Sequence, residues 1–219
     1  MTSFLSEVES TFPPLLRMPE ELQMALRWME DYGFVRNEAI RYAPLYPATV
    51  KQREGLARTH FTVVDPDLMG AWLGNGDVSV TGRVAPFIVT GGEGSQAGIW
   101  MDDTGVQRFV HLGSGSGSTL SCVLADNAVD FLRLLAIGYE ELCWPEVFAL
   151  TPEDAYANEH RGDQPVVSYR PPFEFRQWVA STFHVIVPRT ASEIVTRVSD
   201  MDAAFSDDPF WQWARKVAG

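Results

Sequence analysis

Short apolar segments separated by turn residues constrain this fold more than any other feature of the sequence. The segments are separated by Gly74-Asn75-Gly76, by Gly91-Gly92 and by an Asp-Asp-Thr-Gly run at 102–105, and such residues favour tight turns. Strands joined by short turns pair with their neighbours in antiparallel fashion. Pro86 lacks a backbone donor and therefore predicts an edge or a bulge in its strand. The expected strands are 60–64, 84–90, 97–101, 106–112 and 120–125.

Helix patterns flank these strands. One starts at Pro19 with two carboxylates behind it and stops near Gly33, and the strongest runs over 126–142. The sequence therefore predicts an α+β fold, in which a largely antiparallel sheet is flanked by helices. We expect an α+β domain over 1–150 and a helical C-terminal extension over 151–219 that packs on it. After a polar stretch, that extension should contain a helix over 171–183, a strand over 184–187, and helices starting near 190 and 207.

Length and composition restrict the class of protein. A chain of 219 residues, 46% of them hydrophobic, buries enough surface to fold without a disulfide or a metal. Cys122 and Cys143 are accordingly expected to be small core residues. The N-terminal residues lack a basic and apolar leader, and no apolar run approaches the ~18 residues of a membrane span, so we expect a cytoplasmic protein.

The net charge of −12 is concentrated in the middle of the chain. Residues 93–163 hold 12 acids against 3 bases. Repulsion from phosphates argues against nucleic acids and anionic membranes as partners. The excess acids form either a solvated face that keeps the protein soluble or a docking surface for a basic partner.

Motifs for catalysis and cofactors are weak. The four histidines show no metal-ligand spacing, and no serine lies in a G-x-S-x-G elbow. The glycine–serine run 113–119 lacks the lysine of a phosphate-binding loop. We therefore expect no catalytic residue, no metal and no cofactor. Two alternatives stay open: an enzyme in which His111 or another titratable residue meets a carboxylate, and a nucleotide site at 113–119.

Several segments resemble the SUKH superfamily, which includes bacterial immunity proteins and a fungal cell-wall assembly regulator. The resemblance rests on WMDD at 100–103, RFVHLGSGSG at 108–117, VLADNAVDFLRLLA at 123–136 and MPEEL at 18–22. It spans about 18–145, and PPFEFRQWV at 171–179 is similar to extensions on some bacterial members. It implies a protein-binding protein, since bacterial members commonly neutralise toxins, many of them nucleases.

The acidic middle segment and the resemblance together predict an immunity protein that occludes the active site of a cognate, basic toxin. The alternative is an intracellular scaffold or regulator of the same fold without a toxin partner. The acids that we predict to bind the partner lie at turns or on a helix face, where we expect their side chains to be fully solvated. Trp100 is either an aromatic anchor of the interface or, by strand alternation, a core residue. The predicted partner-binding residues are Glu93, Trp100, Asp102, Asp103, Glu140 and Glu141.

Overall fold

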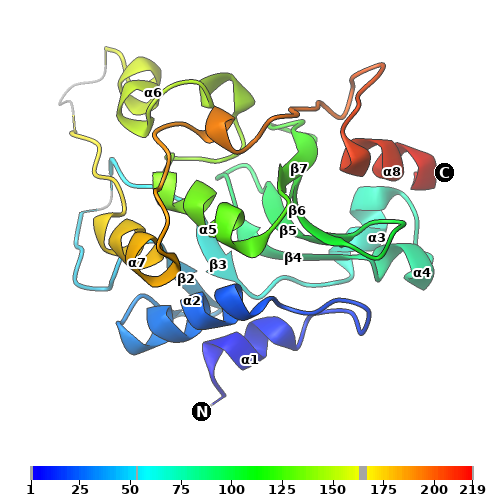
Figure 1. Cartoon of the computed structure of the whole chain (residues 1–219), viewed down its shortest axis with the longest axis horizontal. Coiled ribbons are helices and arrows are strands. Elements are labelled where there is room, and N and C mark those ends of the chain that lie inside the picture. The colour runs from blue at the N-terminus through cyan, green and yellow to red at the C-terminus, as the bar shows by residue number, and fades with distance from the viewer. Residues whose placement is uncertain (1, 53, 163–166, 219) are drawn as a thin grey trace.

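A single antiparallel sheet organises the structure, a computed structural model that describes residues 2–52, 54–162 and 167–218. Its seven strands lie side by side in sequence order, each antiparallel to the next. The predicted α+β class with a sheet flanked by helices is confirmed (Figure 1). Pro86 lies at a shift in register between two central strands, which is the predicted bulge. The strands are β1 (Arg36–Asn37), β2 (Arg41–Pro44), β3 (His60–Thr62), β4 (Val84–Val89), β5 (Gln96–Met101), β6 (Gln107–Leu112) and β7 (Ser121–Ala125).

The helices cover both faces of the sheet. Successive strand residues point to opposite faces, so Phe109 enters the main core whereas Val110 enters a second, smaller core. The main core is closed by α1 (Phe4–Glu9), α2 (Glu20–Asp31), α5 (Ala128–Ile137) and α7 (Phe173–Phe183). The other elements are α3 (Leu68–Leu73), α4 (Val78–Thr81), α6 (Pro152–Glu159), α8 (Pro209–Val217) and the 3-10 turns η1 (Pro145–Val147) and η2 (Ala191–Glu193).

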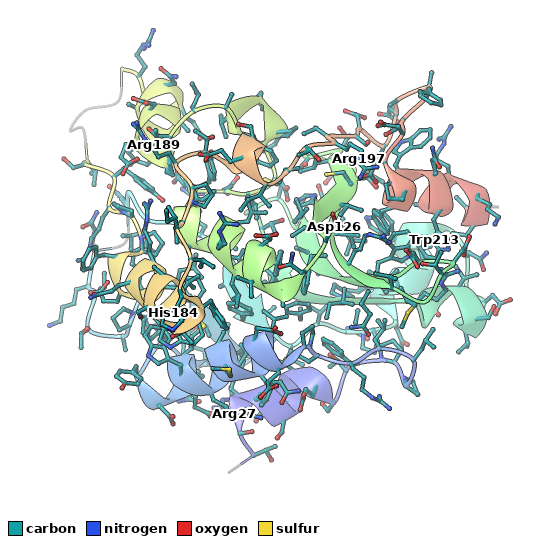
Figure 2. The ribbon with its side chains drawn as sticks, in the orientation of Figure 1. Arg27, Asp126, His184, Arg189, Arg197 and Trp213 are labelled. Carbon is teal, nitrogen blue, oxygen red and sulfur yellow. The ribbon has the colours of Figure 1, made fainter. Side chains whose placement is uncertain are left out.

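Helix α8 closes the second core at the far end of the molecule from α6 (Figure 1). Trp213 projects from α8 toward the sheet, and its ring centroid lies 5.5 Å from that of Trp100 (Figure 2). Phe210 lies 5.4 Å from Trp100 and is fully buried. Aromatic pairs at this separation add to the burial of their apolar area. The C-terminal helix is therefore part of the packed body.

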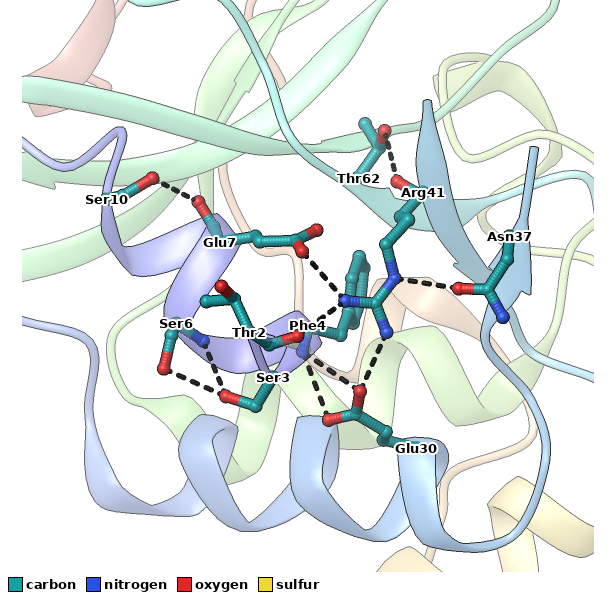
Figure 3. A network of polar contacts seen from close by, with 10 residues as sticks. All are labelled: Thr2, Ser3, Phe4, Ser6, Glu7, Ser10, Glu30, Asn37, Arg41 and Thr62. Atoms are coloured by element: carbon teal, nitrogen blue, oxygen red, sulfur yellow. Dashed lines mark hydrogen bonds and ion pairs between the residues drawn. The ribbon is translucent and has the colours of Figure 1, made fainter. Parts of the chain in front are cut away.

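An arginine fixes the two N-terminal helices to the sheet. Arg41 of β2 donates to Glu7 of α1 at 2.9 Å and to Glu30 of α2 at 2.7 Å (Figure 3). Its guanidinium also lies 5.6 Å from the centre of the Phe4 ring. Only 17% of the Arg41 side chain is exposed, so these ion pairs are partly shielded from solvent.

Three predictions of secondary structure are wrong. The strongest helix ends at Ile137 and not at 142, because Gly138 takes the left-handed conformation that ends helices. Residues 184–187 form no strand, since the side chains of Arg133 and Arg176 bind the carbonyls of Ile186 and Val187 that a neighbouring strand would bind. The helix expected from 190 is only the short turn η2.

Candidate functional site

The predicted partner-binding acids fall into two groups. Glu93 precedes strand β5, whereas Asp102 and Asp103 follow it. Six strand residues span roughly 20 Å, so the two groups lie at opposite ends of the strand. Glu140 and Glu141 belong with Glu93, because Glu141 accepts the backbone N–H of Gly92 at 2.8 Å. The six residues therefore do not form one continuous surface.

Asp102 and Asp103 are engaged within the fold. The Asp102 carboxylate accepts the backbone N–H groups of Thr104 and Val106 and pairs with Arg108. Burial alone would raise the pKa of Asp102, but these hydrogen bonds outweigh it and hold the pKa far below its usual range. Asp103 lies 2.7 Å from Arg83. Asp102 thus shapes the β5–β6 turn, and the expectation that it is fully solvated is wrong, because only 10% of its side chain is exposed.

Trp100 lies in the second core with 2% of its surface exposed. Its ring is covered by Phe210 and Trp213 of α8. The structure therefore supports the core alternative for this residue, and its side chain is not presented to a partner.

The early end of helix α5 places Glu140 and Glu141 in a loop. Gly138 lies against Pro172, where an added Cβ would come within 2.2 Å of the proline Cδ. Tyr139 then anchors the loop by donating to the carbonyl of Leu150 at 2.7 Å. The side chains of Glu140 and Glu141 are only 9% and 14% exposed. The expected exposed helix face is therefore wrong for both residues.

These two glutamates line a cleft of about 480 Å³ between the 139–147 loop and α6. The acids and aromatic residues of its wall come from both sides. The wall includes Glu140, Glu141, Glu146, Glu159, Tyr139, Trp144 and Tyr156. We call this feature the acidic cleft.

Two bases face the acids of the cleft. Arg58 lies 3.0 Å from Glu140 and 3.5 Å from Glu141, and His160 Nε2 lies 2.8 Å from Glu140 Oε2. Burial, together with the nearby carboxylate of Glu140, raises the pKa of Glu159. Within the described residues, the four carboxylates that line the cleft thus outnumber the two bases paired with Glu140 and Glu141. The resulting negative potential favours a cationic ligand.

Glu93 lies beside Glu141 but faces the glycine–serine loop. Its carboxylate accepts the N–H of Ser95 at 2.6 Å, and its Cγ lies 2.7 Å from the position of a Cβ added at Gly117. Burial alone would raise the pKa of Glu93, but hydrogen bonds from Ser95 and Cys143 lower it. An anion at this loop would therefore lie next to a carboxylate.

The backbone of the loop is also occupied. The N–H of Gly113 is bound by Leu120 O, and the N–H of Gly115 by Ser118 O. Ser95 Oγ accepts the N–H of Ser114. These amides do not point outward to cradle a phosphate. The geometry argues against the nucleotide alternative.

Sequence reasoning missed Glu146, Glu159 and His160. Helix α6, which carries Glu159 and is followed by His160, lies in the polar stretch that begins the C-terminal extension, where no helix was predicted. The sequence did contain a signal, namely Thr151 followed by Pro152 and two acids. In the structure the Thr151 hydroxyl accepts the N–H of Asp154 at 3.2 Å, as a helix cap does. A threonine cap followed by proline and two acids is typical of a helix start.

Comparisons with known proteins give no match to a family model, a curated protein or a solved structure. Within the described part of the chain, no helix is long and apolar enough to cross a membrane. Both cysteines are free and buried, as predicted.

Proposed function

We propose that this protein is a cytoplasmic immunity protein that binds a cognate, basic toxin and occludes its active site. The acidic cleft carries the proposal, because it concentrates buried and exposed carboxylates in one concave surface. The resemblance of the sequence to the SUKH superfamily supplies the class of partner. A toxin that cleaves nucleic acid needs a basic surface for its polyanionic substrate. A cleft rich in carboxylates would compete for that surface.

The walls of the cleft suit a lysine or arginine side chain. Trp144 is held in place because its indole N–H donates to Glu141 at 2.9 Å. A cation next to an aromatic face gains from the charge distribution of the ring, and more so where water is excluded. Glu146 and Glu159 lie at the exposed side of the cleft, where they would meet an approaching basic group first. Such rim charges mainly accelerate association.

Co-expression tests the proposal. The product of the adjacent reading frame would be expressed alone, where we expect it to stop growth, and together with this protein. We expect growth to be restored and the two proteins to copurify. Unrelieved toxicity, or a neighbouring product that is harmless, would exclude the immunity function.

The scaffold alternative makes a different prediction in the same experiment. If this protein is a regulator without a toxin partner, the neighbouring product should not affect growth, whether this protein is present or absent. The result would then favour a host protein as the occupant of the acidic cleft.

A further inference from the structure

Three side chains at the acidic cleft lie close together, two of them from its wall and the third, His160, beside it. The donor atoms of Glu140, Glu159 and His160 all lie within 4.8 Å of one another. Glu140 follows α5, whereas Glu159 ends α6 and His160 comes next in the chain. The cluster is therefore assembled by tertiary packing of two segments. It combines an imidazole nitrogen with two carboxylate oxygens.

The side chain of Glu140 is held in a fixed orientation. Only 9% of the surface of Glu140 is exposed, and its Oε1 pairs with Arg58 Nη2 at 3.0 Å. The second oxygen, Oε2, is left facing His160 Nε2 at 2.8 Å. A backbone contact reinforces the arrangement, because the N–H of Arg58 donates to the Glu140 carbonyl at 2.7 Å. Outer hydrogen bonds of this kind orient ligands in protein metal sites.

The donor set selects a class of ion. Mg²⁺ and Ca²⁺ prefer oxygen ligands alone, whereas Zn²⁺ and related ions accept imidazole together with carboxylates. We propose that Glu140, Glu159 and His160 bind one transition-metal ion of the Zn²⁺ class. The ion takes the place of the proton between His160 Nε2 and Glu140 Oε2. Three protein ligands leave one position of a four-coordinate ion for water.

Binding requires only a small rearrangement. Ligand atoms lie about 2.0–2.2 Å from Zn²⁺, so donors around one ion are roughly 3–3.6 Å apart. The His160–Glu140 pair is already close to that separation. Glu159 is exposed, and its side chain can rotate toward the other two. The fold itself does not need to move.

Calorimetric titration of the full chain with ZnCl₂, after treatment with a chelator, tests the proposal. We expect one equivalent of Zn²⁺ to bind. Because a ligand is lost, Glu159→Gln and His160→Gln should each weaken binding by at least about tenfold. Glu146→Gln is the matched control, since it removes a cleft carboxylate outside the cluster and should leave the Kd within about twofold.

Two results would overturn the proposal. One is a wild-type chain that binds no Zn²⁺ or binds it equally well in the Glu159→Gln and His160→Gln variants. The other is displacement of Zn²⁺ by an equal concentration of Mg²⁺, which would show a carboxylate surface without a nitrogen ligand. Co²⁺ provides a spectroscopic check, because its visible absorption in the wild-type protein should change when His160 is replaced.

Discussion

Asp208 joins the C-terminal helix to the edge of the sheet through Val123. Its carboxylate accepts the backbone N–H of Val123 in β7 at 2.8 Å and that of Trp211 in the first turn of α8 at 2.9 Å. One side chain thus caps a helix and satisfies a donor of the outer strand. Unpaired edge donors promote association with other chains, and here the edge is covered by the segment that leads into α8.

Replacing Asp208 by alanine should destabilise the protein by about 2–3 kcal/mol, because the variant loses a helix cap and leaves a strand donor unpaired. The free energy of unfolding in urea measures the effect. Asp207→Ala is the control, since Asp207 is exposed, and should change stability by less than about 0.5 kcal/mol. Equal stabilities of the two variants would show that the Asp208 contacts contribute little.

Replacing His184 by glycine should stabilise the protein by about 1 kcal/mol. His184 ends α7 with a φ of 53°, a left-handed conformation that costs energy for a residue with a Cβ (Figure 2). The side chain is exposed, so little packing is lost. His184→Ala keeps the Cβ and should give no such gain. A rise in the melting temperature for glycine alone confirms the strain, and a fall would contradict it.

His111 should stay neutral well below neutral pH. Its Nδ1 lies 2.9 Å from the Leu120 carbonyl, which can only accept, so Nδ1 carries the hydrogen and Nε2 accepts from the Thr90 hydroxyl. Complete burial lowers the pKa of His111 from 6.5 to about 4. In NMR spectra its ring should therefore not titrate between pH 7 and 5. A midpoint near the ordinary value would contradict this assignment.

The same shift makes stability depend on pH. The folded chain resists protonation of His111 and the unfolded chain does not. The contribution of His111 to the free energy of unfolding is therefore complete above pH 6.5 and is lost as the pH falls toward 4. Protonation of this residue should lower the free energy of unfolding by about 2 kcal/mol between pH 7 and pH 5. Burial also lowers the pKa of His60, which adds in the same direction. Urea unfolding at pH 7 and 5 measures the sum, and equal stability at both values would exclude it.

Replacing Arg41 by methionine should cost about 2 kcal/mol, because Glu7 and Glu30 are then left without their shared cation (Figure 3). Arg27→Met is the matched control. Arg27 is exposed and contacts only Gln23 at 2.8 Å among the hydrogen bonds of the described residues. Thermal unfolding should separate the two variants by several degrees. Similar melting temperatures would mean that solvent replaces the Arg41 pairs.

Local signals predicted much of the sheet. The turn at 102–105 and the bulge at Pro86 depend on residues next to one another, and the structure has both. The end of α5 could not be placed in the same way. Gly138 does lie inside an otherwise helical pattern, but only the folded chain shows that it lies against Pro172, which is distant in the sequence.

The acidic cleft was beyond prediction for the same reason. Glu140 meets Arg58 and His160 only after three separate segments have packed together. Charge density along the sequence pointed to the third of the chain that contains the acids of the cleft, but it could not show that Asp102 is engaged in its own hairpin. Burial and pairing decide which carboxylates are available, and both are tertiary properties.

We propose that the acidic cleft holds the toxin, and the affinity of a cleft variant is the sharpest test of this placement. Calorimetry with the copurified toxin would compare the wild type, Glu146→Lys/Glu159→Lys, and Asp31→Lys/Asp67→Lys, with EDTA present to remove metal ions. The two double variants change the net charge equally, but Asp31 and Asp67 are exposed outside the cleft. We predict at least about a hundredfold loss for the cleft variant and a change of less than about threefold for the control. Equal losses in both variants, or none in the cleft variant, would contradict the claim.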